Sequence, residues 1–174
     1  MAFIVEDGSI IANANAYITV AELKAYWDSR ADTITQVDAE VQAAIIIATQ
    51  YVDLNYNWRG EIVSDTQNLD WPRANVIDDQ GRSLASDAIP TALKNAICEY
   101  AKRQLASSIQ PDVSTEVGGI TKIREKVDVI EQEIEYEEGS TGYYGIKKYP
   151  LADRWLKGLT IGGVGGSFGQ LRRC

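Results

Sequence analysis

Two short segments of the chain combine tryptophan with arginine, a pairing that can bind nucleic acid. They are Tyr56-Asn57-Trp58-Arg59-Gly60 and Trp71-Pro72-Arg73. Aromatic rings stack on single-stranded bases, and guanidinium groups beside them add cation–π and phosphate contacts. Large rings in a connection can instead anchor it to the core or to a neighbouring subunit, with the arginines paired to acids such as Asp70. The sequence favours such anchoring for Trp58, Arg59, Trp71 and Arg73, with base stacking as the alternative.

The other reactive residue types do not indicate an enzyme. The chain has no histidine, the commonest general base and metal ligand. Cys98 and Cys174 have no spacing typical of a disulfide framework or a metal site. The glycine run 162–166 lacks the lysine and the serine or threonine of a phosphate-binding loop. We therefore predict a protein without catalytic residues, metal ligands or cofactors.

Charge is divided unevenly along the chain. The net charge is −8, from 17 basic and 25 acidic residues. Residues 139–174 contain six basic residues and Asp153 as the single acid, so this end is +5 and the preceding part is −13. An acidic body repels phosphate, because most nucleic-acid affinity comes from neutralising the backbone charge. The sequence therefore predicts that DNA contact, if any, involves the C-terminal end.

Helical periodicity dominates the first two thirds of the sequence. Thr19 followed by Glu22 is typical of a capping box at a helix start. The run Ile45-Ile46-Ile47 widens the apolar face of the next helix, which indicates burial on more than one side, in a bundle or against a neighbouring subunit. We expect a mainly α fold, a small bundle of three long helices plus a short C-terminal helix. The expected helices span about residues 20–29, 38–55, 90–110 and 150–159.

Residues 120–136 mix branched apolar residues with charges in near alternation, which is typical of β structure. The parity of the apolar residues changes near residue 130, so a bulge, a turn or a split is expected there. We predict a β-hairpin or ribbon whose Glu131, Glu133 and Glu135 protect an exposed edge. The expected organisation is a helical core over 1–110, a ribbon extension over 111–148, and a short helix with a flexible glycine-rich tail over 149–174.

The final segment, 161–174, offers little apolar surface against the entropy of ordering it, so it is expected to be disordered in the free subunit. It nevertheless contains spaced apolar residues followed by two arginines. We predict that these residues order against a partner, as a peptide added to a neighbouring protein. They are Ile161, Val164, Phe168, Leu171, Arg172 and Arg173.

Six segments stand out in order along residues 14–110, and no comparable motif follows them. They are Ala16–Glu22, Ala43–Asp53, Trp58–Gly60, Gln67–Arg73, Asp79–Arg82 and Ile89–Ala101. In this order they resemble a family of small helical proteins of tailed bacteriophages, the head-tail connector or head-completion adaptors. Part of that family is described as DnaT-like single-stranded DNA-binding.

The resemblance implies a structural, non-enzymatic neck subunit made in the host cytoplasm and placed at the head–tail junction of the virion. Its copies would form a homo-oligomeric, dodecameric ring between the portal and the tail or tail-completion proteins, without membrane contact. Genomic DNA would pass through the channel without specific binding, and Glu131, Glu133 and Glu135 are candidates for lining that channel, because an acidic lumen repels moving DNA. The tail segment would then bind portal or a neighbouring subunit. The alternative is a DnaT-like replication accessory protein that binds single-stranded DNA.

Overall fold

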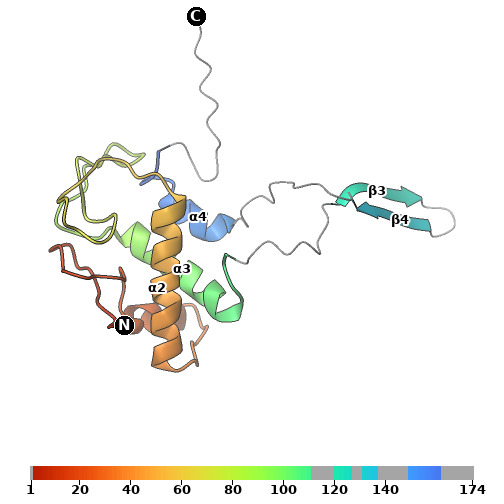
Figure 1. Cartoon of the computed structure of the whole chain (residues 1–174), viewed down its shortest axis with the longest axis horizontal. Coiled ribbons are helices and arrows are strands. Elements are labelled where there is room, and N and C mark those ends of the chain that lie inside the picture. Colours follow the sequence, from red (N-terminus) through yellow and green to blue (C-terminus); the bar gives the residue numbers. More distant parts are fainter. Residues whose placement is uncertain (1, 111–119, 127–130, 137–148, 162–174) are drawn as a thin grey trace, which may run out of the picture. The chain divides into compact units, whose positions relative to one another are not determined.

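The computed structural model describes residues 2–110, 120–126, 131–136 and 149–161. The chain divides into two compact units, one formed by residues 1–109 and 148–174 and the other by residues 110–147. Four helices of the described part lie in the first unit, and a two-stranded antiparallel sheet forms the described part of the second (Figure 1). The mainly helical class and the ribbon are thus as the sequence predicts.

The first helix, α1 (Val20–Asp28), begins at the predicted capping box. The Thr19 hydroxyl accepts from the Glu22 amide at 3.1 Å, and the Glu22 carboxylate accepts from the Thr19 amide at 2.7 Å. The prediction of three long helices is wrong, because α1 has nine residues. The helix ends at Asp28, and Ala31 shortly after it has a positive φ of 55°, which a right-handed helix does not allow. Two long helices are therefore flanked by two short ones.

The long helices are α2 (Asp38–Asn55) and α3 (Thr91–Ala106), and the short α4 (Pro150–Leu156) completes the bundle. α3 packs against both α2 and α4, and α2 crosses over α3 in the view of Figure 1. The predicted apolar face of α2 is buried. The run Ile45-Ile46-Ile47 does not widen this buried face around the helix, because Ile45 is buried while Ile47 is exposed. The buried residues of α2 are Val41, Ala44, Ile45, Ala48, Thr49, Tyr51 and Val52.

The connection between α2 and α3 contains a short pair of strands, β1 (Glu61–Ile62) and β2 (Arg73–Ala74), that the sequence did not predict. They are antiparallel, with Glu61 opposite Ala74. Gly60 precedes them with a φ of +70°, and a Cβ there would lie 2.2 Å from the Ala74 carbonyl oxygen. A side chain at this position is therefore incompatible with the close approach of the two strands.

The second unit contains β3 (Ile120–Lys126) and β4 (Glu131–Tyr136), paired antiparallel. Residues 127–130, where the sequence predicts the break, lie outside the described residues. The register pairs positions occupied by basic residues in β3 with positions occupied by glutamates in β4. The facing pairs are Lys122 with Glu135, Arg124 with Glu133, and Lys126 with Glu131.

Candidate functional site

The two tryptophans of the sequence-predicted clusters lie inside the protein. Trp71 is fully buried and Trp58 is 6% exposed. Their rings meet edge to face, with centroids 5.7 Å apart and an interplanar angle of 85°. Neither ring offers a free face to a base, so this geometry favours anchoring over base stacking at these two positions.

The arginines beside them bind main-chain carbonyl groups. Arg73 donates to the carbonyl oxygens of Arg59 and Gly60, each at 2.9 Å, and of Asp70 at 3.2 Å. The expected pairing of an arginine with the Asp70 carboxylate is not formed, because that carboxylate accepts from the Trp58 indole at 2.9 Å. Arg59 donates to the carbonyls of Ile77 and Thr160, each at 3.1 Å. These guanidinium groups thus satisfy the backbone of an irregular connection.

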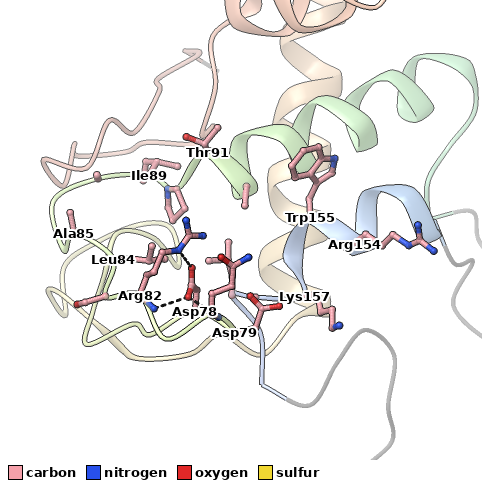
Figure 2. Close-up of a pocket in the computed structure, with 17 residues that line it drawn as sticks. Asp78, Asp79, Arg82, Leu84, Ala85, Ile89, Thr91, Arg154, Trp155 and Lys157 are labelled. Atoms are coloured by element: carbon pink, nitrogen blue, oxygen red, sulfur yellow. Dashed lines mark hydrogen bonds and ion pairs between the residues drawn. The ribbon is translucent and has the colours of Figure 1, made fainter.

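A different part of the surface forms an open pocket of about 700 Å³. One wall is the loop from Asp78 to Ile89, a second is the first turn of α3, and a third is α4 with the residues that follow it (Figure 2). On the loop wall, Asp78 accepts from the Arg82 side chain and from the Arg82 amide, each at 2.8 Å. These hydrogen bonds, the backbone one first, hold the pKa of Asp78 below its usual range. The Arg82 charge is therefore already compensated.

The α4 wall combines an exposed aromatic ring with uncompensated cations. Trp155 is 37% exposed. Leu156 and Leu159 are buried, whereas Leu151 is exposed. Arg154 and Lys157 are exposed and take part in none of the ion pairs found among the described residues. The signal for this surface that the sequence offered is the run Arg154-Trp155-Leu156-Lys157.

The inner side of α4 is held by a buried carboxylate. Asp153 is 7% exposed and accepts from the Tyr56 hydroxyl at 2.8 Å and from the Tyr100 hydroxyl. The two hydroxyl oxygens are 2.6 Å apart. Burial, followed by the hydrogen bond to Asp153, raises the pKa of Tyr100 far above its usual value, so Tyr100 stays neutral. These contacts orient α4 with Trp155 on its outer side.

The segment after α4 returns to the connection between α2 and α3. Thr160 forms an antiparallel bridge with Trp58, and the Ile161 amide donates to the Asn57 carbonyl at 2.8 Å. The Ile161 side chain is exposed. The other predicted partner-binding residues, Val164, Phe168, Leu171, Arg172 and Arg173, lie outside the described residues. Glu131, Glu133 and Glu135 lie on β4 in the second unit.

Within the described residues, no group of three or more acidic, cysteine or histidine side chains is arranged to hold a metal ion. No helix in that part of the chain is long and apolar enough to span a membrane.

Comparison with known families places the chain in one of them. The whole chain, residues 1–174, matches the family described as "putative DnaT-like ssDNA binding protein", and the protein belongs to this family. The match corrects the resemblance drawn from the sequence: it supports its DnaT-like part and gives no support to a head-tail connector family. No curated protein and no solved structure matches the chain.

Proposed function

We propose that this protein binds single-stranded DNA along the outer face of α4. The observation behind the proposal is that α4 and the residue after it carry the exposed Trp155 together with two exposed cations, Arg154 and Lys157, which form none of the ion pairs found among the described residues. An aromatic platform flanked by positive charge is the usual way in which proteins hold single strands without reading sequence. The family match points to the same ligand.

The pocket beside Trp155 offers further groups for a phosphate. α3 follows Pro90 at its N-cap, has no side-chain hydrogen bond to its first amides, and has no acidic residue in its first turn. Such an uncapped helix start favours negative charge. The loop wall contributes the acidic Asp78 and Asp79 instead. We therefore expect the phosphates to lie along α4 and the start of α3, with one base against Trp155.

The acidity of the rest of the chain confines DNA to a small area. Residues 1–138 have a net charge of −13, which opposes phosphate contact elsewhere. Affinity is therefore expected to be modest and strongly salt-dependent. For every phosphate that a variant no longer neutralises, the slope of log K against log salt should become shallower by about 0.7.

The test is fluorescence anisotropy with a labelled oligothymidine at several salt concentrations. The double variant R154A/K157A should bind more weakly and with a shallower salt slope. The matched control is K24A/K102A, which removes the same charge from two lysines that are paired to Asp38 and Asp32. Equal binding by parent, control and R154A/K157A would contradict the proposal.

Two further variants locate the site within the chain. W155A should weaken binding by about tenfold or more, because stacking contributes about 1–3 kcal/mol per base. Deletion of residues 162–174, which include Arg172 and Arg173, should leave measurable binding. If the deletion alone abolishes binding while W155A binds like the parent, the tail is the site and the α4 proposal fails.

A second function is favoured by a different observation, the apolar surface left open on α2. Ala43, Ile47 and Leu54 share one exposed side of this helix, and Leu54 is 79% exposed. The exposed Leu151 and Trp155 form a matching patch on α4, beyond α3. The first turn of α2 contains the acidic residues Asp38 and Glu40, whereas the α4 patch has cations near it. The α2 surface of one copy can therefore contact the α4 surface of the next copy, head to tail. Contacts of this kind generate rings.

On this second hypothesis the protein is a non-enzymatic adaptor ring between portal and tail proteins at the head–tail junction of a virion. Sedimentation velocity distinguishes the two functions. I47E/L54E should prevent self-association but leave DNA binding intact if DNA is the ligand of α4. The control T33E/T35E adds the same charge in the exposed segment before α2. A monomeric parent at all concentrations, with no binding to portal rings, would contradict the adaptor hypothesis.

A further inference from the structure

Asp53, near the end of α2, is partly buried, and no cation among the described residues is hydrogen-bonded to it. Both of its carboxylate oxygens lie 2.9 Å from the Tyr17 hydroxyl, and one accepts from the Asp70 amide at 3.3 Å. Tyr17 is fully buried. The N-terminal segment and the connection after α2 therefore meet at this one carboxyl group.

The hydrogen bonds continue from Asp53 into both tryptophans. The Tyr17 hydroxyl accepts from the Trp71 amide at 3.1 Å, and the Asp70 carboxylate accepts from the Trp58 indole at 2.9 Å. Arg73 is the cation facing Asp53, but its guanidinium group donates to main-chain carbonyls. Asp53 and Asp70 thus share one small region, and within the part of the chain that the structure describes neither carboxyl group is hydrogen-bonded to a cation.

We propose that Asp53, Asp70 and Tyr17 form a pH-sensitive clamp on the 56–74 connection, which is tighter when Asp53 holds a proton. The hydrogen bonds donated by Tyr17 and the Asp70 amide favour an ionised Asp53, but burial and the Asp70 charge oppose ionisation more strongly. A neutral Asp53 keeps a carbonyl oxygen as an acceptor and no longer repels the Asp70 charge. An ionised Asp53 adds a second, poorly solvated negative charge to the same region. The clamp therefore loosens as the pH rises.

The pH range over which Asp53 loses its proton follows from the groups around it. Burial, followed by the neighbouring Asp70 charge, raises the pKa of Asp53 from 3.8 to about 7. Burial also raises the pKa of Tyr17 well above its usual value, so Tyr17 remains a neutral donor. Because the folded pKa is the higher one, the stabilisation is complete below about pH 4 and is lost as the pH rises through about 7.

The clamp reaches the segment that follows α4. Trp58 bridges to Thr160, and the Arg59 amide donates to the Leu159 carbonyl at 2.9 Å. Loosening the 56–74 connection therefore weakens the hold on residues 159–161 near neutral pH. This device does not depend on which ligand the protein binds.

The experiment is urea unfolding of the full chain between pH 5 and 8.5, followed by tryptophan fluorescence. Relative to D53N, the parent should lose up to about tenfold in its folding equilibrium constant per pH unit until Asp53 is ionised. The control D65N removes an exposed carboxylate from the same connection and should keep the parent's pH dependence. Carbon-13 NMR should show Asp53 titrating near pH 7, and D70N should move that midpoint lower. An Asp53 midpoint below about 5, or a parent-like slope in D53N, would overturn the proposal.

Discussion

The 56–74 connection and α4 both contain tryptophan beside arginine, yet they use these residues in opposite ways. In the connection, Trp58 and Trp71 are buried against each other and Arg73 binds carbonyl groups. On α4, Trp155 is exposed, and Arg154 forms none of the ion pairs found in the described residues. The same pair of residue types thus builds an interior anchor in one place and an open surface in the other.

The difference arises from what each backbone lacks. A long irregular connection leaves many carbonyl groups without partners, and arginine side chains supply donors to them. A helix satisfies its own backbone, so the cations of α4 remain available to solvent or a ligand. Tryptophan beside arginine therefore indicates a ligand surface only when the backbone carbonyl groups around it already have hydrogen-bond partners.

The largest expected contrast is between the two kinds of tryptophan. W71A should destabilise the protein by about 3–5 kcal/mol, because it leaves a cavity in the core. W155A should cost clearly less, because its ring is 37% exposed and its removal leaves no closed cavity. Urea unfolding measures both. Equal losses would mean that the α4 ring also belongs to the core.

The inner side of α4 gives a second, smaller contrast. Y100F removes one of the two hydroxyl donors to the buried Asp153 and should cost about 1–3 kcal/mol. Y26F is the matched control, because its acceptor Glu99 keeps an ion pair with Arg103 at 2.8 Å. Thermal melting followed by circular dichroism compares them. A Y26F loss larger than that of Y100F would contradict this account of how α4 is held.

Arg73 and Arg154 should show the smallest difference in stability loss, and the larger loss should again be in the 56–74 connection. R73A leaves the carbonyl groups of Arg59, Gly60 and Asp70 without this donor and should cost about 1–2 kcal/mol. R154A should lie within about 0.5 kcal/mol of the parent, since Arg154 is exposed and forms no ion pair in the described part of the chain. Chemical denaturation of both variants at one pH is sufficient. A stability loss in R154A alone would reverse the comparison.

Much of the fold is determined by local sequence. The capping box at Thr19 and Glu22, the range of α2 and the buried residues at its helical spacing could all be predicted, because they depend on contacts within a few turns. The antiparallel ribbon is also visible in the alternation of residues 120–136. Its register agrees with the charges, since basic residues of β3 face Glu131, Glu133 and Glu135.

Other features depend on contacts between segments far apart in the sequence. Helical spacing does not determine which side of α4 faces the core; Asp153 turns inward to Tyr56 and Tyr100 and so places Trp155 on the outer side. Asp70 was expected to pair with an arginine, but its nearest donor is the Trp58 indole, twelve residues away. Periodicity identifies the helices because their hydrogen bonds are local. The face that each short helix exposes, and the partner that each buried carboxylate finds, are decided by tertiary packing.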